Sequence, residues 1–140
     1  MTLDLQKPEK MEAGRELDVK IAEIMGWTNI RFDAYIGWYG NSAGSQMSNA
    51  IPRFSTTGDG MLRMLEWANN NHVPIWFHVD MAGAFATAFL PPDKKYPSGS
   101  VQIFHAANVM EMPEAVARAI HAWKDEQEES ALKARIREEL

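Results

Sequence analysis

The stretch VPIWFHVDMAGAFATAFL, residues 73–90, decides the fold. Two strand-like runs, 73–80 and 84–90, flank a tight turn at Met81-Ala82-Gly83, and the alternating side chains of such runs point to opposite faces of a sheet. A third strand-like run, 100–106, follows a longer connection that carries three prolines. Connections of this kind predict an antiparallel meander of three strands.

The side chains of these strands predict what covers the sheet. Both faces of residues 73–80 carry apolar side chains, which is typical of a sheet covered on both sides. One face of the next strand consists of Ala84, Ala86 and Ala88. Because alanine leaves little bulk on a sheet, we expect a helix to pack closely there.

Three helical segments are expected, two before the meander in the sequence and one after it. Residues 9–25 carry apolar side chains at a three-and-four spacing that places them on one helix face, most firmly from Arg15 onward. Gly26 is well placed to end this helix. A second helix is expected after Ser55-Thr56-Thr57, because hydroxyl side chains cap helix starts. A third helix is expected to begin at Pro113.

In the segment between the first two helices, the apolar side chains no longer follow the three-and-four spacing of a helix. Residues 29–39 alternate between apolar and polar side chains, which indicates a strand or one arm of a hairpin. Residues 40–52 are rich in glycine, serine and asparagine, which is typical of a long loop.

The end of the chain carries a separate apolar stripe. Leu132, Ile136 and Leu140 follow each other at a spacing of four, and at about 100° per residue they point roughly opposite to Trp123. One straight helix could not bury both against a single surface. Either the chain breaks near residues 125–130, or the tail packs on something else, such as another subunit.

Length and composition indicate one globular domain. The chain has 140 residues, of which 46% are hydrophobic, as is usual for a single folded domain. We divide it into a flexible lead (1–8), the domain itself (9–125) and a charged helical extension (126–140).

Charge and cysteine content exclude several classes of protein. The net charge of -5 argues against general nucleic-acid binding, because neutralising phosphates requires clustered Lys and Arg. The absence of cysteine excludes disulfides, thiolate zinc sites and cysteine nucleophiles. The first residues lack the pattern of a signal peptide, and no apolar run is long enough to cross a bilayer. We therefore expect a cytoplasmic protein.

Local motifs resemble a known family. Residues 15–27 end in Met-Gly-Trp, residues 51–56 contain a Pro-x-aromatic-Ser-Thr entry to the second helix, and residues 112–123 are rich in alanine. Together they resemble the phage ABA sandwich domain over roughly residues 14–125. Phe54 departs from the pattern, since tyrosine is usual at that position.

The resemblance implies an α/β (α+β) fold, a three-layer α/β/α sandwich with a mainly antiparallel sheet flanked by helices. It also implies a phage or prophage protein that acts in the cytoplasm of the bacterial host. It carries no established reaction.

One segment holds groups that suit a flat, negatively charged ligand. Aromatic rings can stack on a base, and Arg53 precedes a helix start whose free N–H groups favour an anion, although Asp59 opposes an anion there. The predicted ligand-binding residues are Tyr35, Trp38, Tyr39, Asn41, Ser42, Arg53 and Ser55. The alternative is that Trp38 and Tyr39 fill the core or a hairpin while the loop is solvated.

Catalytic motifs are weak. His78 and His105 could form a pair on adjacent strands, but neither is followed by the Ser or Thr that two-histidine phosphoesterases need. The histidines lack the helical spacing of a metal site, and no nucleophile elbow, phosphate loop or dinucleotide fingerprint is present. A partly buried histidine on a sheet face is the simpler interpretation of both residues.

Three hypotheses follow from these observations. The first is a non-enzymatic phage module that binds a nucleotide-like small molecule and counters host defence signalling. The second is an interaction module that docks a host or virion protein, and the third is an enzyme of unrecognised type. We favour the first, with no cofactor, no metal and no membrane partner, and with a homo-oligomer formed through the C-terminal helix.

Overall fold

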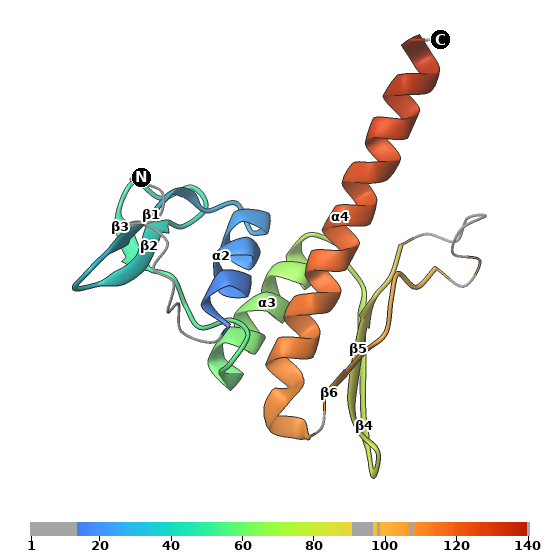
Figure 1. Cartoon of the computed structure of the whole chain (residues 1–140), viewed down its shortest axis with the longest axis horizontal. Helices are drawn as coiled ribbons and strands as arrows, with labels where there is room; N and C mark the ends of the chain where they lie inside the picture. Colours follow the sequence, from blue (N-terminus) through green and yellow to red (C-terminus); the bar gives the residue numbers. More distant parts are fainter. Residues whose placement is uncertain (1–13, 91–96, 98, 107, 140) are drawn as a thin grey trace.

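The computed structural model describes residues 14–90, 97, 99–106 and 108–139. The expected flexible lead, residues 1–8, lies outside the described part, as do residues 9–13 of the first expected helix. The described residues form two three-stranded antiparallel sheets and three α-helices, an α+β fold, which confirms the predicted class. In Figure 1 the helices form a single layer between the two sheets rather than two outer layers.

The predicted meander forms the second sheet. Its strands are β4 (Ile75–Asp80), β5 (Gly83–Ala88) and β6 (Phe104–Ala106), paired antiparallel in that order. The pairing of β4 with β5 is regular over the whole strand, from Ile75 opposite Ala88 to Asp80 opposite Gly83. This register leaves only Met81 and Ala82 in the turn, as the sequence predicts.

The helices begin and end where local chemistry requires it. They are α2 (Arg15–Ile24), α3 (Gly58–Asn70) and α4 (Met112–Glu139), the last preceded by the short 3₁₀ turn η1 (Val109–Glu111). Gly26, with φ +94°, follows the end of α2, and glycine adopts this left-handed conformation without strain. The Thr57 hydroxyl oxygen accepts the Gly60 N–H at 2.9 Å and caps α3.

Helix α4 packs on the alanine face of β5, as expected. Ala84, Ala86 and Ala88 are fully buried, and α4 contacts both β5 and β6. The opposite face, which we expected to be covered as well, carries no described helix. Trp76 and His105 are exposed on it. The physical reason is that all three helices gather on the alanine side of this sheet.

The first sheet corrects the interpretation of residues 29–52. Its strands are β1 (Thr28–Asp33), β2 (Gly37–Asn41) and β3 (Ser48–Ala50), in that order. The alternating segment is therefore a complete hairpin, whose turn forms because the Asp33 carboxylate accepts the N–H groups of Tyr35 and Ile36 at 2.7 and 3.0 Å. The expected loop contains the end of β2 and the whole of β3.

A buried polar network joins α2 to the segment before α3. The Arg15 guanidinium donates to the Asp18 carboxylate at 2.9 Å and to the Ile51 carbonyl at 2.9 Å. The other Asp18 oxygen accepts the backbone N–H of Ser55 at 2.8 Å and its hydroxyl at 2.7 Å. Gly14 completes the site: its φ is +83°, and a Cβ there would lie 2.7 Å from the Ser55 hydroxyl oxygen.

The last helix is unbroken. Helix α4 runs through residues 125–130 without interruption, which excludes a break there, and its length is about 42 Å at 1.5 Å per residue. Its final turns extend beyond the rest of the described chain (Figure 1), where the side chains are exposed. No helix among the described residues has the length and apolar content needed to cross a membrane.

We expect Asp18→Ala to lower the free energy of unfolding by about 3–5 kcal/mol, because it leaves the buried Arg15 charge and the Ser55 N–H without their partner. Urea denaturation followed by circular dichroism measures this change. Glu114→Ala is the control: it removes an exposed pair with Arg118 at 3.5 Å, which we expect to cost no more than about 1 kcal/mol. Equal losses in the two variants would contradict the assigned role of the network.

Candidate functional site

Two of the predicted ligand-binding residues are packed inside the protein. Trp38 is 8% exposed and packs edge-on against Phe32, with ring centroids 5.5 Å apart. Ser55 is 2% exposed, and its hydroxyl donates to Asp18. Both residues therefore stabilise the fold from within, and neither is available to a ligand in this structure.

Three others lie on the first sheet and its turn. Tyr35 stands at the tip of the β1–β2 turn and is almost fully exposed. The Arg31 guanidinium lies 4.3 Å from the ring centroid of Tyr39 and donates to its hydroxyl at 2.8 Å, so that ring face is already occupied. The side-chain amide oxygen of Asn41 accepts the Ser48 hydroxyl at 3.1 Å.

The remaining two, Ser42 and Arg53, share a hollow at the start of α3. Its volume is about 640 Å³, and Trp27 supplies its aromatic ring. The carboxylate of Asp59 also lines it and accepts the Arg63 guanidinium at 3.1 Å. The structure thus brings together two of the seven predicted residues, with an acidic group beside them.

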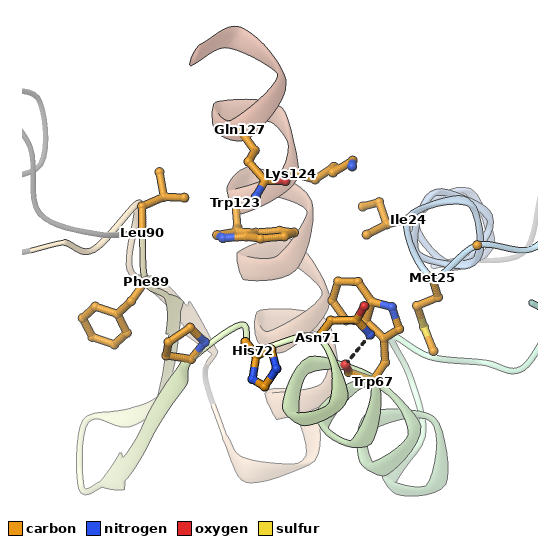
Figure 2. A pocket seen from close by; sticks show the side chains of 12 residues that line it. Ile24, Met25, Trp67, Asn71, His72, Phe89, Leu90, Trp123, Lys124 and Gln127 are labelled. Carbon is orange, nitrogen blue, oxygen red and sulfur yellow. Dashed lines mark hydrogen bonds between the residues drawn. The ribbon is translucent and has the colours of Figure 1, made fainter. Parts of the chain in front are cut away.

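A second hollow, where α2 and α3 end beside α4, combines rings with few charges. It has a volume of about 700 Å³, within the usual range for small-molecule sites. We call it the two-tryptophan pocket (Figure 2). It is lined by Ile24, Met25, Gly26, Trp67, Asn71, His72, Pro74, Phe89, Leu90, Trp123, Lys124 and Gln127.

The two tryptophans meet because α3 and α4 pack against each other. The rings of Trp67 and Trp123 are nearly perpendicular, at 76°, with centroids 6.1 Å apart. This edge-to-face arrangement is favourable, and both rings line the hollow. The Asn71 amide donates to the Trp67 carbonyl at 2.9 Å, which holds the last turn of α3 beneath the pocket (Figure 2).

The polar side of the pocket carries no negative charge. None of its lining residues is an aspartate or glutamate, although the whole chain has a net charge of -5. Lys124 supplies a cation, and His72, Gln127 and Asn71 supply polar groups. Lys124 also lines a neighbouring hollow, which contains Lys20 and His121 as well as Glu23, Asp125 and Glu128.

No protein-family model, curated protein or solved structure matches the chain. The assignment of a function therefore rests on the geometry and charge of the chain itself.

Sequence reasoning did not identify the two-tryptophan pocket. The sequence places Trp123 on the helix face opposite to Leu132 and Ile136, and no sequence motif singles out Trp67. The only local signal is the polar end of α3, where Asn71 and His72 follow the tryptophan. Which rings meet depends on the packing of helices that lie far apart in the sequence.

The two strand histidines fasten the β4–β5 turn. His78 Nε2 lies 2.9 Å from a carboxylate oxygen of Asp80, and His105 Nε2 lies 2.9 Å from the Ala82 carbonyl oxygen. The Ala82 N–H, which donates to Asp80 at 2.7 Å, holds the pKa of that carboxyl below its ordinary value, and His78 lowers it further. Within the described ranges, no three His, Cys, Asp or Glu side chains gather as metal ligands do.

We expect NMR titration to give Asp80 a pKa below that of an unstructured aspartate. Because the folded pKa is lowered, the stabilisation it contributes is present above the unfolded value and is lost as the pH falls through the folded value. His78→Ala should raise the pKa of Asp80 toward the ordinary value, whereas His121→Ala, on α4, should leave it unchanged. A pKa of Asp80 equal to that of an unstructured aspartate would contradict its hydrogen bonds to Ala82 and His78 in the native chain.

Proposed function

We propose that the chain is a non-enzymatic binding module that holds a flat, negatively charged small molecule of nucleotide type in the two-tryptophan pocket. The observation that carries this proposal is the lining, in which two tryptophan rings meet and a lysine but no carboxylate borders the same hollow. A pocket that is mostly apolar, with a few convergent polar groups, is the usual form of a small-molecule site.

Each part of such a ligand has a matching group in the lining. A base would stack on an indole face, with Phe89 and Leu90 excluding water on one side and Ile24 and Met25 on the other. The Gln127 amide provides both a donor and an acceptor for a base edge. The Lys124 ammonium would attract the phosphate, and the His72 ring could offer it a hydrogen-bond donor.

The resemblance to the phage ABA sandwich domain supports a setting for this activity. The Met-Gly-Trp motif ends α2 at the pocket, where Met25 and Gly26 are part of the lining. In the Pro-x-aromatic-Ser-Thr motif of residues 51–56, the backbone N–H and the hydroxyl of Ser55 both donate to Asp18. We therefore propose a phage protein that acts in the bacterial cytoplasm and sequesters a nucleotide signal of host defence.

Thermal unfolding against a panel of ribonucleotides and cyclic nucleotides tests the proposal. A ligand present at 100 times its Kd should stabilise the native chain by about 2.7 kcal/mol. Trp123→Ala should weaken binding roughly 5- to 150-fold, because stacking on one ring contributes about 1–3 kcal/mol. The matched control is Trp76→Ala, which removes an exposed tryptophan from β4. The absence of stabilisation by any member of the panel, or equal weakening in both variants, would contradict the proposal.

A second candidate function is docking of a protein through the end of α4. Leu132 and Ile136 lie one turn apart on the extended part of this helix, and each is about half exposed. A helix that presents an apolar stripe to solvent fits a groove or another helix. The partner would be a host or virion protein, or the C-terminal helix of a second copy.

Replacing Leu132 and Ile136 together by serine should abolish capture of such a partner and leave the melting temperature of the isolated chain nearly unchanged, because neither residue is buried. Affinity capture from host lysate followed by mass spectrometry measures the first effect. The double variant Ala131→Ser with Ala134→Ser, on other faces of the same helix, is the control. Capture that survives the loss of Leu132 and Ile136 would exclude this surface.

A further inference from the structure

Strand β4 is an open sheet edge with apolar side chains on both faces. Among the described residues it pairs only with β5, and that pairing has no irregularity. Trp76, Phe77 and Val79 are 45%, 46% and 52% exposed. A long, regular, apolar edge is a template for another strand, because its outer N–H and C=O groups lack partners.

The other sheet edges carry the features that prevent such pairing. Strand β1 has an irregularity between Thr28 and Arg31, and it bears the charges of Arg31 and Asp33. Strands β3 and β6 have only three residues each. In β4, residues 75–79 contain neither proline nor a fixed charge nor a bulge, and these are the devices that proteins use to block edges.

The direction of the backbone groups follows from the β4–β5 ladder. The Phe89 N–H donates to the Pro74 carbonyl at 3.0 Å, so the Pro74 carbonyl points toward β5. Directions alternate along an antiparallel strand. The backbone groups of Trp76, His78 and Asp80 therefore also point toward β5, and those of Ile75, Phe77 and Val79 point to the open edge.

We propose that β4 pairs antiparallel with β4 of a second copy about a twofold axis at Phe77. Phe77 then lies opposite Phe77 of the second copy, and Ile75 lies opposite Val79. These residues are the ones whose N–H and C=O groups point outward, so each such pair forms two hydrogen bonds. The β4–β5–β6 sheet of one copy and the β4–β5–β6 sheet of the other then form one continuous sheet.

The side chains favour a second copy in this register. Trp76 comes to lie opposite His78, and these two rings already stack within one strand, at 6° and 5.8 Å. Cross-strand aromatic and β-branched pairs stabilise sheets. A register centred on His78 would instead place the Asp80 carboxylate opposite Trp76. Because the strand complements itself about Phe77, the same patch serves on both partners.

Single cysteines test the register directly, because the natural chain contains none. Paired residues that exchange hydrogen bonds have Cα atoms about 5.5 Å apart, within disulfide range. We expect Phe77→Cys to form a covalent dimer on mild oxidation, while Trp76→Cys and His78→Cys alone do not. A mixture of Ile75→Cys and Val79→Cys chains should cross-link to each other. Stronger cross-linking of Trp76→Cys or His78→Cys than of Phe77→Cys would overturn the proposal.

Sedimentation velocity of the full chain tests the association without cross-linking. The native chain should sediment as a dimer, and Val79→Lys should shift it to monomer by placing a charge in the interface. Met110→Lys, which changes an exposed methionine on η1, is the control and should remain dimeric. A native chain that stays monomeric, or a dimer that Val79→Lys leaves intact, would overturn the proposal. So would a dimer that is lost on deletion of residues 126–140, because association would then depend on the end of α4.

Discussion

The buried contact between Arg15, Asp18 and Ser55 is the constraint on which the arrangement of α2 and α3 depends. Removing two opposite charges from water is costly unless each is fully hydrogen-bonded. Here the guanidinium and both carboxylate oxygens have partners inside the chain. The network fixes α2 against the segment that leads into α3. Since Ile24 of α2 and Trp67 of α3 line the same pocket, the geometry of the pocket depends on this contact.

The second constraint is the alanine face of β5. Its small side chains let α4 approach the sheet closely, and the buried residues of α4 lie in its first half. Trp123 comes just after this buried part, at the level where α3 ends. The pocket therefore forms where close packing ceases, between large rings that cannot fill the remaining space. The same geometry leaves the later turns of α4 outside the body of the chain.

Two of the exposed apolar surfaces of the described chain are the edge of β4 and the stripe of Leu132 and Ile136. They differ in chemistry. The edge offers outward backbone groups and complements itself about Phe77, which suits a second copy. The stripe is narrow and flanked by charged residues such as the Glu129–Lys133 pair at 3.0 Å, which suits a separate partner.

Local signals predicted the helices and the second sheet of this protein, while β3 of the first sheet and the sites depended on long-range packing. Glycine after α2, threonine before α3 and the alternating strands each act on neighbouring residues, so the sequence predicts the helices, the meander and the tight β4–β5 turn. Alternation also shows that Trp38 and Tyr39 lie on opposite faces of a strand, but it cannot say which face is inward. Only the folded chain showed that Trp38 is buried, that Tyr39 is covered by Arg31, and that Trp67 meets Trp123. A periodic pattern encodes the face of one element, whereas a pocket requires the relative placement of several, which depends on side-chain packing between residues distant in the sequence.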